Sequence, residues 1–243
     1  MDILKRILFF LREFFFQQGC SICGMPCTSL DEAWYGLCDD CRAGIEQELA
    51  ETQDQESCEY CGKPLISEQG RCLSCRRTET LAFDRAIILF PYSGKYQKLL
   101  GSYKFDKHLS LGHFFAEIIR KTLEEKSIPV ETGIVPVPPR PGKIRKTGWD
   151  QVEYLARLLE KDKNCNHPVI RCLKRLRSKS QKELSRKNRQ TNMKGRIISK
   201  GQVPQTALII DDVITTGSTL DVCASALKEA GAHTVYALCL FYD

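Results

Sequence analysis

Two adjacent carboxylates stand directly before a short loop that is rich in hydroxyl groups. Asp211 and Asp212 follow the apolar run 208–210, and residues 215–219 read Thr-Thr-Gly-Ser-Thr. The hydroxyl and backbone N–H groups of such a loop, placed before a helix, suit a phosphate. Carboxylates beside the loop would repel a bare anion, so the ligand must also bring hydroxyl groups or a metal ion. A ribose 5-phosphate satisfies both halves of this pattern.

The cysteines predict two structural metal sites. Eight of the thirteen form four Cys-x-x-Cys pairs, and each pair can present two thiolates to one tetrahedral zinc ion. We expect the first pair to join the second and the third to join the fourth, because each set then closes a local hairpin. Cys27 is a spare thiol near the first set. The predicted ligands are Cys20, Cys23, Cys38, Cys41, Cys58, Cys61, Cys72 and Cys75.

Cysteine usage and the N-terminal sequence indicate the compartment. The other five cysteines are scattered and odd in number, which favours a reducing compartment over a disulfide framework. Residues 1–16 mix apolar and basic residues, but Arg12 and Glu13 interrupt the apolar run, which is too short to span a bilayer. Its spacing predicts an amphipathic helix that docks on the protein itself, with membrane binding as the alternative. We expect a cytoplasmic protein without a transmembrane segment.

Charge is divided unevenly along the chain. Residues 1–80 carry a formal net charge of −6 and residues 81–243 one of +12. Residues 171–200 hold twelve basic residues and a single acid, Glu183, which indicates an anionic partner or substrate. We expect the middle of this run to be a loop. Its candidate nucleic-acid contacts are Lys179, Lys182, Arg186, Lys187 and Arg189.

The elements that must position these groups alternate between strand and helix. The expected strands cover 86–92, 134–138, 208–210 and 234–241; the expected helices cover 94–103, 109–125, 149–161 and 219–230. A loop is expected over 139–148. This alternation predicts an α/β fold, a mainly parallel sheet with helices on both faces, preceded by the small zinc-ribbon unit. Ligands of such sheets bind at the C-terminal ends of strands, where Asp211 and Asp212 are expected.

Residues 207–219 resemble the phosphoribosyl pyrophosphate signature of type I phosphoribosyltransferases: hydrophobic residues, two aspartates, two hydrophobic residues, then Thr-Thr-Gly-Ser-Thr. Together with the two ribbons, further motifs resemble the ComF competence family in the same order. They are Tyr103-Lys-Phe105, Val135-Pro-Val-Pro138, Gly148-Trp-Asp-Gln151 and Gln181-x-x-Leu-Ser-x-x-x-Arg-x-x-Asn192. The family is associated with uptake of transforming DNA in bacteria, alongside a helicase-like ATPase and proteins that handle single strands. The domains implied are a helix over 1–16, a double zinc ribbon over 17–80 and a phosphoribosyltransferase-like domain over 81–243.

The resemblance also implies a chemistry. A phosphoribosyltransferase, an enzyme of the glycosyltransferase class, lets an acceptor attack the anomeric carbon of phosphoribosyl pyrophosphate while pyrophosphate leaves. Asp211 and Asp212 would engage the ribose hydroxyls as the catalytic pair, and magnesium would bridge pyrophosphate and ribose. Segment 178–194 would close over the site as a lid. The substrate-binding residues implied are Thr215, Thr216, Gly217, Ser218 and Thr219 for the 5-phosphate, and Lys143, Arg145 and Lys146 for pyrophosphate.

Two alternatives stay open. The family usually has Arg-Gly-Phe-Asn-Gln where this chain has Thr-Gly-Trp-Asp-Gln over 147–151, so an arginine becomes Thr147 and an amide becomes Asp150. The chain is then either an enzyme whose acceptor the sequence does not identify, or a non-catalytic module that binds single-stranded DNA and retains the phosphate pocket. The basic run suits the phosphates of a single strand, although it lacks aromatic residues for stacking on bases. A further possibility is that the basic run binds no nucleic acid and is only a solvated lid.

Overall fold

A computed structural model of the chain describes residues 19–53, 56–58, 60–65, 67–77, 81–176 and 197–242. The helix expected over 1–16 and the basic run from Lys179 to Arg189 lie outside the described residues. The chain forms two compact units. The helical unit takes in Met1–Gln55 and Phe90–Lys126, and the sheet unit takes in Glu56–Leu89 and Ser127–Asp243. The two cysteine sets therefore belong to different units.

The helical unit is built around a helix whose apolar residues recur every four positions. Its helices are α2 (Leu30–Tyr35), α3 (Asp39–Gln53), α5 (Lys95–Lys104) and α6 (Ser110–Glu125). In α6, Leu111, Phe115 and Ile119 are fully buried, and the ring of Tyr103 from α5 meets Phe115 edge-on at 5.2 Å. The helices expected over 94–103 and 109–125 are confirmed.

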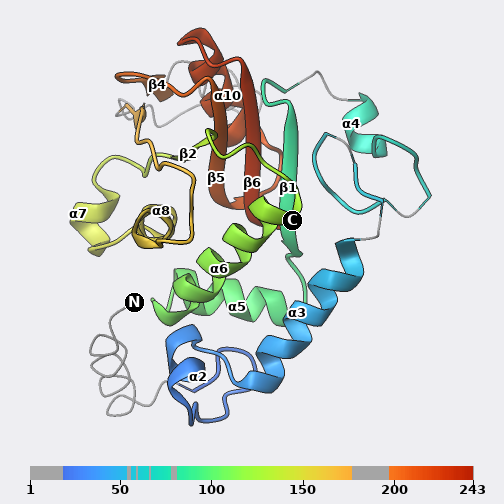
Figure 1. Ribbon diagram of the computed structural model, residues 1–243, viewed down its shortest axis with the longest axis vertical. Coiled ribbons are helices and arrows are strands. Elements are labelled where there is room, and N and C mark those ends of the chain that lie inside the picture. The colour runs from blue at the N-terminus through green and yellow to red at the C-terminus, as the bar shows by residue number, and fades with distance from the viewer. Residues whose placement is uncertain are drawn as a thin grey trace, which may run out of the picture. The chain divides into compact units, whose positions relative to one another are not determined.

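The sheet unit contains a four-stranded sheet in the order β1-β6-β5-β2 (Figure 1). The strands are β1 (Arg85–Pro91), β2 (Gly133–Pro136), β5 (Thr206–Ile214) and β6 (Thr234–Tyr242). The strand β5 runs parallel to both of its neighbours, β2 and β6. The predicted α/β class with a mainly parallel sheet is confirmed.

Helices cover both faces of β5. The run Ala207–Ile210 is fully buried, as expected for a central strand with no solvent-facing side. Ala207 and Ile209 pack with apolar residues of α10 (Ser218–Glu229). Successive strand residues point to opposite faces, so Asp212 lies on the face opposite Ala207 and Ile209. On that face α8 (Gln151–Lys161) contacts β5, since Gln151 donates to Asp212. Full burial of each Leu or Ile stabilises the fold by about 1.5–3 kcal/mol.

Two expected boundaries differ in the structure. The strand β5 does not end before the aspartates: it continues to Ile214, because β6 pairs with it as far as Tyr242. The expected loop 139–148 contains a short helix, α7 (Lys143–Thr147). Glycines with φ of 80° flank this helix at Gly142 and Gly148, a left-handed conformation that glycine adopts without strain.

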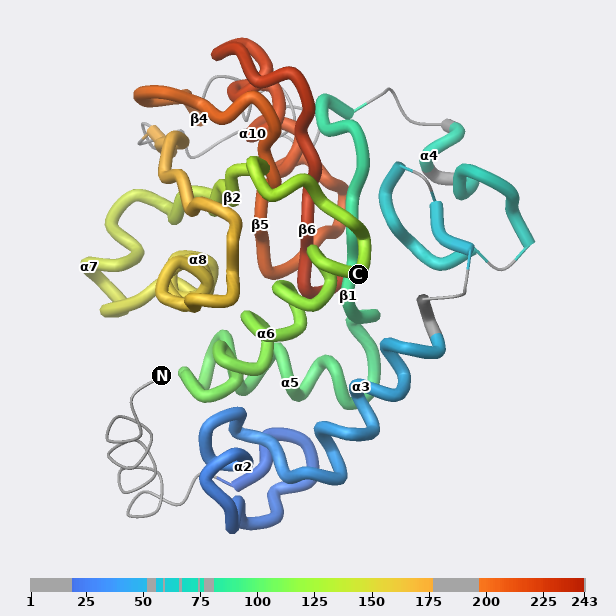
Figure 2. Tube along the Cα trace, viewed as in Figure 1, coloured from blue at the N-terminus to red at the C-terminus, as the bar shows by residue number. Residues whose placement is uncertain are grey.

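Several short elements were not foreseen, among them two strands and a helix. The strands β3 (Leu173–Arg175) and β4 (Ile197–Ser199) form an antiparallel pair near the two ends of the basic segment 171–200. The helix α4 (Leu73–Arg77) belongs to the second cysteine segment, which runs beside β1 in Figure 2. There the backbone N–H of Ala86 donates to the carbonyl oxygen of Tyr60 over 2.9 Å. Within the described ranges, no helix is both long enough and apolar enough to cross a membrane.

Candidate functional site

The two aspartates of β5 occupy different environments. Asp212 is 7% exposed, whereas Asp211 is half-buried and, by strand alternation, points to the α10 face. Asp211 lies opposite Cys239 of β6 in the same sheet register. Burial, together with the negative charges of Asp211 and Asp212, raises the pKa of Cys239 well above its usual value, so this thiol stays protonated. The predicted pair therefore divides between two faces of the sheet.

The hydroxyl-rich run forms the turn between β5 and α10. Thr215 and Thr216 are exposed, and Thr216 Oγ1 lies 2.8 Å from Ser218 Oγ. Gly217 has a φ of 73° and directly precedes the first helical residue, Ser218. The left-handed glycine lets the chain turn sharply into α10, whose first N–H groups carry partial positive charge. The arrangement offers hydroxyl groups and a helix N-terminus next to Asp211.

The same edge of the sheet receives the segment after β2. The end of β2 is level with the residue that precedes the aspartates, since Pro136 pairs with Ile210. The chain then passes through α7 into α8, and Gln151 Nε2 donates to Asp212 Oδ2 over 2.7 Å. Lys143, which was predicted to bind pyrophosphate, donates to Asp150 Oδ2 over 2.6 Å and to Gln151 Oε1.

The two departures from the family motif have clear structural roles. Asp150 is 5% exposed and caps α8, because its Oδ1 accepts from the backbone N–H groups of Val152 and Glu153 at 3.1 and 3.0 Å. Thr147 Oγ1 lies 2.9 Å from the carbonyl oxygen of Lys143, which closes α7. Arg145 and Lys146 are exposed on α7. Asp150 and Gln151 were not predicted as site residues, although both lie in the quoted motif.

The first cysteine set forms a compact cluster in the helical unit. The ligand atoms of Cys20, Cys23, Cys38 and Cys41 all lie within 4.8 Å of one another. Cys23 Sγ and Cys38 Sγ are 3.7 Å apart. Two sulfurs bound to one tetrahedral zinc ion at about 2.3 Å would be about 3.8 Å apart, so the spacing fits zinc. The first turn is closed by Gly24, whose N–H donates to the carbonyl oxygen of Cys20 over 2.8 Å.

The second set repeats this geometry in the sheet unit. Cys58, Cys61, Cys72 and Cys75 also place their ligand atoms within 4.8 Å, and Cys61 Sγ lies 3.7 Å from Cys72 Sγ. The left-handed Gly62 follows the first pair. The predicted pairing, first with second and third with fourth, is confirmed, and the two groups could hold two zinc ions.

Thiol acidity within the clusters explains why a cation suits them. Burial raises the pKa of Cys58, but hydrogen bonds from neighbouring backbone N–H groups outweigh burial and lower this pKa to about 6. Burial and hydrogen bonds to neighbouring thiols raise the pKa of Cys75 far above its usual value. In the first cluster, the pKa of Cys20 is lowered to about 7 and the pKa of Cys41 is raised. A dication at the centre of each cluster would favour the deprotonated form of every cysteine and so hold all four side chains as thiolates.

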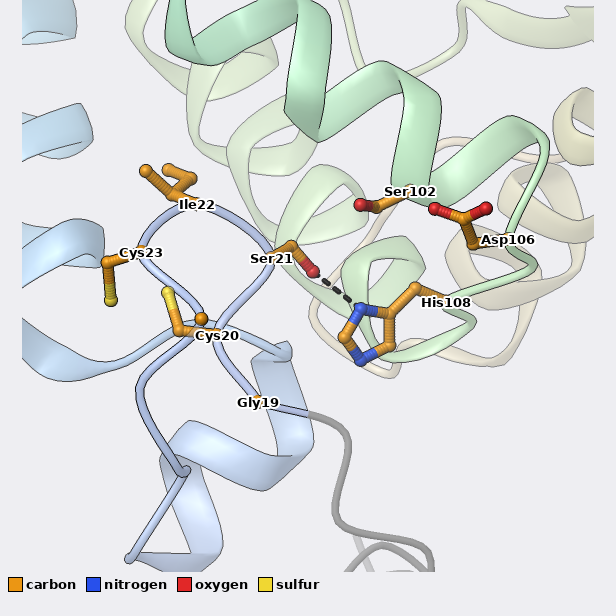
Figure 3. Close-up of a pocket in the computed structure, with 9 residues that line it drawn as sticks. Gly19, Cys20, Ser21, Ile22, Cys23, Ser102, Asp106 and His108 are labelled. Carbon is orange, nitrogen blue, oxygen red and sulfur yellow. Dashed lines mark hydrogen bonds between the residues drawn. The ribbon is translucent and has the colours of Figure 1, made fainter.

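A cavity of about 470 Å³ lies beside the first cluster, within the helical unit (Figure 3). The turn between Cys20 and Cys23 forms one side, and Ser102, Asp106 and His108 form the other. Ser21 Oγ lies 2.5 Å from Nδ1 of His108, a buried histidine. His113 is also largely enclosed, with its ring 3.8 Å from that of Trp34. Both histidines therefore make contacts inside the helical unit.

Comparison with known proteins gives consistent relatives over most of the chain, although no family model matches it. Competence protein F of Haemophilus influenzae is 26% identical over 232 residues, covering 91% of this chain and 95% of the relative. Competence protein ComFC of Streptococcus pneumoniae is 28% identical over 205 residues, covering 82% and 84%. DNA utilization protein YhgH of Escherichia coli is 26% identical over 231 residues, covering 91% and 95%. With its two four-cysteine clusters and its α/β sheet, the chain is similar to the ComF competence proteins over most of its length.

Proposed function

We propose that this protein takes part in DNA uptake or utilization and binds magnesium phosphoribosyl pyrophosphate at the C-terminal edge of β5. The DNA role comes from the names of its relatives. The ligand comes from one observation: Asp211 and Asp212 lie among the last four residues of β5, and a hydroxyl-rich turn and the N-terminus of α10 follow that strand. This combination suits a sugar phosphate that carries both hydroxyl groups and negative charge. The predicted cytoplasmic location is part of the same proposal.

Each part of the pocket has a proposed task. The exposed hydroxyls of Thr215 and Thr216, with Ser218, Thr219 and the N–H groups at Gly217, bind the 5-phosphate. Asp211 and Asp212 bind the ribose hydroxyls. Arg145 and Lys146 are exposed on α7, the helix that follows β2. Their side chains bind the pyrophosphate. Magnesium, when bound, supplies charge neutralisation between the ligand's phosphates and ribose.

The transfer reaction, where it occurs, needs positioning and charge stabilisation from the chain. The bond between the anomeric carbon and pyrophosphate oxygen breaks, and a bond from the carbon to the acceptor forms. The acceptor loses a proton, and pyrophosphate carries away the electron pair. Positive charge develops on the ribose ring, and carboxylates beside the ring stabilise it. The acceptor class is to be found by measuring pyrophosphate release with candidate amines and bases.

Calorimetric titration of magnesium phosphoribosyl pyrophosphate tests the pocket. The wild-type chain is expected to bind one ligand, and Asp211→Asn/Asp212→Asn is expected to bind at least about 100-fold more weakly, because two charged hydrogen-bond acceptors are lost. Glu131→Gln/Glu229→Gln removes the same charge from exposed positions and is expected to bind like wild type. Equal binding by the aspartate variant would refute the pocket.

A second function has support from the same relatives. A competence or DNA utilization role is also served by a protein that binds single-stranded DNA through the basic run and uses the phosphate pocket without transferring a group. The helicase-like ATPase of the family is the proposed protein partner. The two functions differ in one measurable property: only the enzyme releases pyrophosphate.

A further inference from the structure

A buried amide connects the two segments of the candidate pocket. Gln151 begins α8 and Asp212 lies near the end of β5, 61 residues later; each is 7% exposed. Gln151 Nε2 donates to Asp212 Oδ2 over 2.7 Å, and Asp212 Oδ1 accepts from the backbone N–H of Val213 over 3.0 Å. A buried carboxylate is costly unless its oxygens accept hydrogen bonds, so the Gln151 amide stabilises the charged form of Asp212 in one orientation.

Lys143 fixes which way the amide faces. Its ammonium has donors only, and it contacts Gln151 Oε1; Asp212 is a carboxylate, which accepts. Only one orientation of the Gln151 amide satisfies both neighbours. The same ammonium donates to Asp150 Oδ2 over 2.6 Å, and Asp150 caps α8 with its other oxygen. The cap, the lysine and the amide therefore form one chain of hydrogen bonds that ends at Asp212.

We propose that Gln151, held by Lys143, is a positioning residue that fixes Asp212 for the ribose of the ligand. This inference rests on the proposed function. It assigns Lys143 a task different from the pyrophosphate contact expected from the sequence. Asp211 points to the opposite face of β5, so Gln151 acts on Asp212 and not on Asp211.

A double-mutant cycle tests the connection between Gln151 and Asp212. Gln151→Met keeps the length of the side chain and removes its donor, and it is expected to weaken binding of magnesium phosphoribosyl pyrophosphate about tenfold. Combined with Asp212→Asn, it is expected to add less than about twofold to the loss from Asp212→Asn alone, because Gln151 acts on the ligand only through the carboxylate that this substitution removes. Combined with Asp211→Asn, the two losses are expected to multiply.

A ligand without pyrophosphate distinguishes the two possible roles of Lys143, which are to orient Gln151 and to contact pyrophosphate. If Lys143 acts through Gln151, Lys143→Met weakens ribose 5-phosphate binding about as much as Gln151→Met does, and adds little in the Gln151→Met background. A lysine that contacts pyrophosphate leaves ribose 5-phosphate binding unchanged, which would overturn this assignment. Lys161→Met, which removes a charge from the exposed end of α8, is the matched control and is expected to bind as wild type does.

Folding is checked by thermal melting of each variant without ligand. If Gln151→Met does not fold, Gln151→Glu replaces it in the cycle, since Glu keeps the acceptor for Lys143 and lacks the donor for Asp212. The inference is overturned if folded Gln151→Met or Gln151→Glu binds the ligand as wild type does. It is also overturned if the losses of affinity from the Gln151 change and from Asp212→Asn multiply in the double variant. Absence of binding by the wild-type chain refutes the proposed function itself, and this result is distinct from the other two.

Discussion

Ser21 Oγ and His108 Nδ1 are 2.5 Å apart and join the turn between two cysteine ligands to the segment that leads into α6. Ser21 lies between Cys20 and Cys23, so its position depends on the metal cluster. His108 is buried beside the cavity shown in Figure 3. The hydrogen bond therefore couples the metal-binding turn to the apolar core of the helical unit.

Loss of this hydrogen bond is expected to loosen the first cluster. Ser21→Ala leaves a buried imidazole nitrogen without its partner, so we predict a loss of about 1–2 kcal/mol in the free energy of unfolding. Zinc release to a chelator should also become faster. Ser102→Ala, from the opposite side of the same cavity, is the control. Equal zinc release by Ser21→Ala and Ser102→Ala would contradict the prediction.

Metal content tests the two clusters separately. Protein purified without chelator is expected to contain two zinc ions per chain by elemental analysis, and Cys58→Ser is expected to contain one, because its cluster keeps three ligands. Burial, with nearby thiols and Glu32, raises the pKa of Cys27 to about 12, so this thiol stays protonated. Cys27→Ser should therefore keep both ions. A content near zero in the wild-type chain would rule out zinc.

His113 is expected to make the helical unit less stable in acid. Burial lowers the pKa of its imidazole to about 4, against about 6.5 for an unfolded chain. The unfolded state therefore binds the proton first, and stability falls as pH decreases from about 6.5 to about 4, by about 2–3 kcal/mol. Chemical denaturation over this pH range should show a shallower fall for His113→Phe, which keeps a ring against Trp34.

The comparison between the two proteins is essential for this test. Cysteine ligands also bind protons in acid, and zinc loss lowers the stability of both proteins alike. The difference between wild type and His113→Phe isolates the histidine. Parallel curves from pH 7 to pH 4 would show that His113 does not titrate in this range.

The basic run outside the described residues carries the DNA prediction. Its affinity for an oligothymidylate should fall as salt rises, because each contacted phosphate of a single strand contributes about 0.7 to the slope of log affinity against log salt. Replacing Lys179, Lys182, Arg186, Lys187 and Arg189 with Ala should reduce this slope by about 3.5 if each contacts one phosphate. Lys126→Ala/Lys161→Ala removes exposed charge elsewhere as the control. A slope unchanged by the five replacements would exclude the basic run as the DNA site.

Local patterns in the sequence were enough to predict several parts of the structure. The unbroken apolar run before Asp211 predicts a central strand, because only a strand covered on both faces is apolar throughout. The cysteine spacing predicts both ligand sets, because each pair and its partner are close in the chain. Both inferences rest on patterns within short stretches of sequence, and the structure confirms them.

Features that depend on distant contacts were missed. The helix α3 was not predicted, although it covers most of the acidic segment 44–57. Glu48 of α3 accepts hydrogen bonds at 2.6 Å from Lys95 and 2.7 Å from the hydroxyl of Tyr96, both from α5. Likewise, the side chain of Gln151 meets Asp212 only because α8 packs against β5. No local periodicity encodes either pairing, so the sequence could not reveal them.

Amide hydrogen exchange with magnesium phosphoribosyl pyrophosphate tests the central claim most directly, since it reports both binding and location. Peptides that cover residues 211–219 and 143–151 are expected to exchange more slowly with ligand, because the turn before α10 and the segment around Gln151 form the pocket. The same peptides of Asp211→Asn/Asp212→Asn should show no change. Protection that is absent from 211–219 in the wild-type chain, or located elsewhere, would contradict the account.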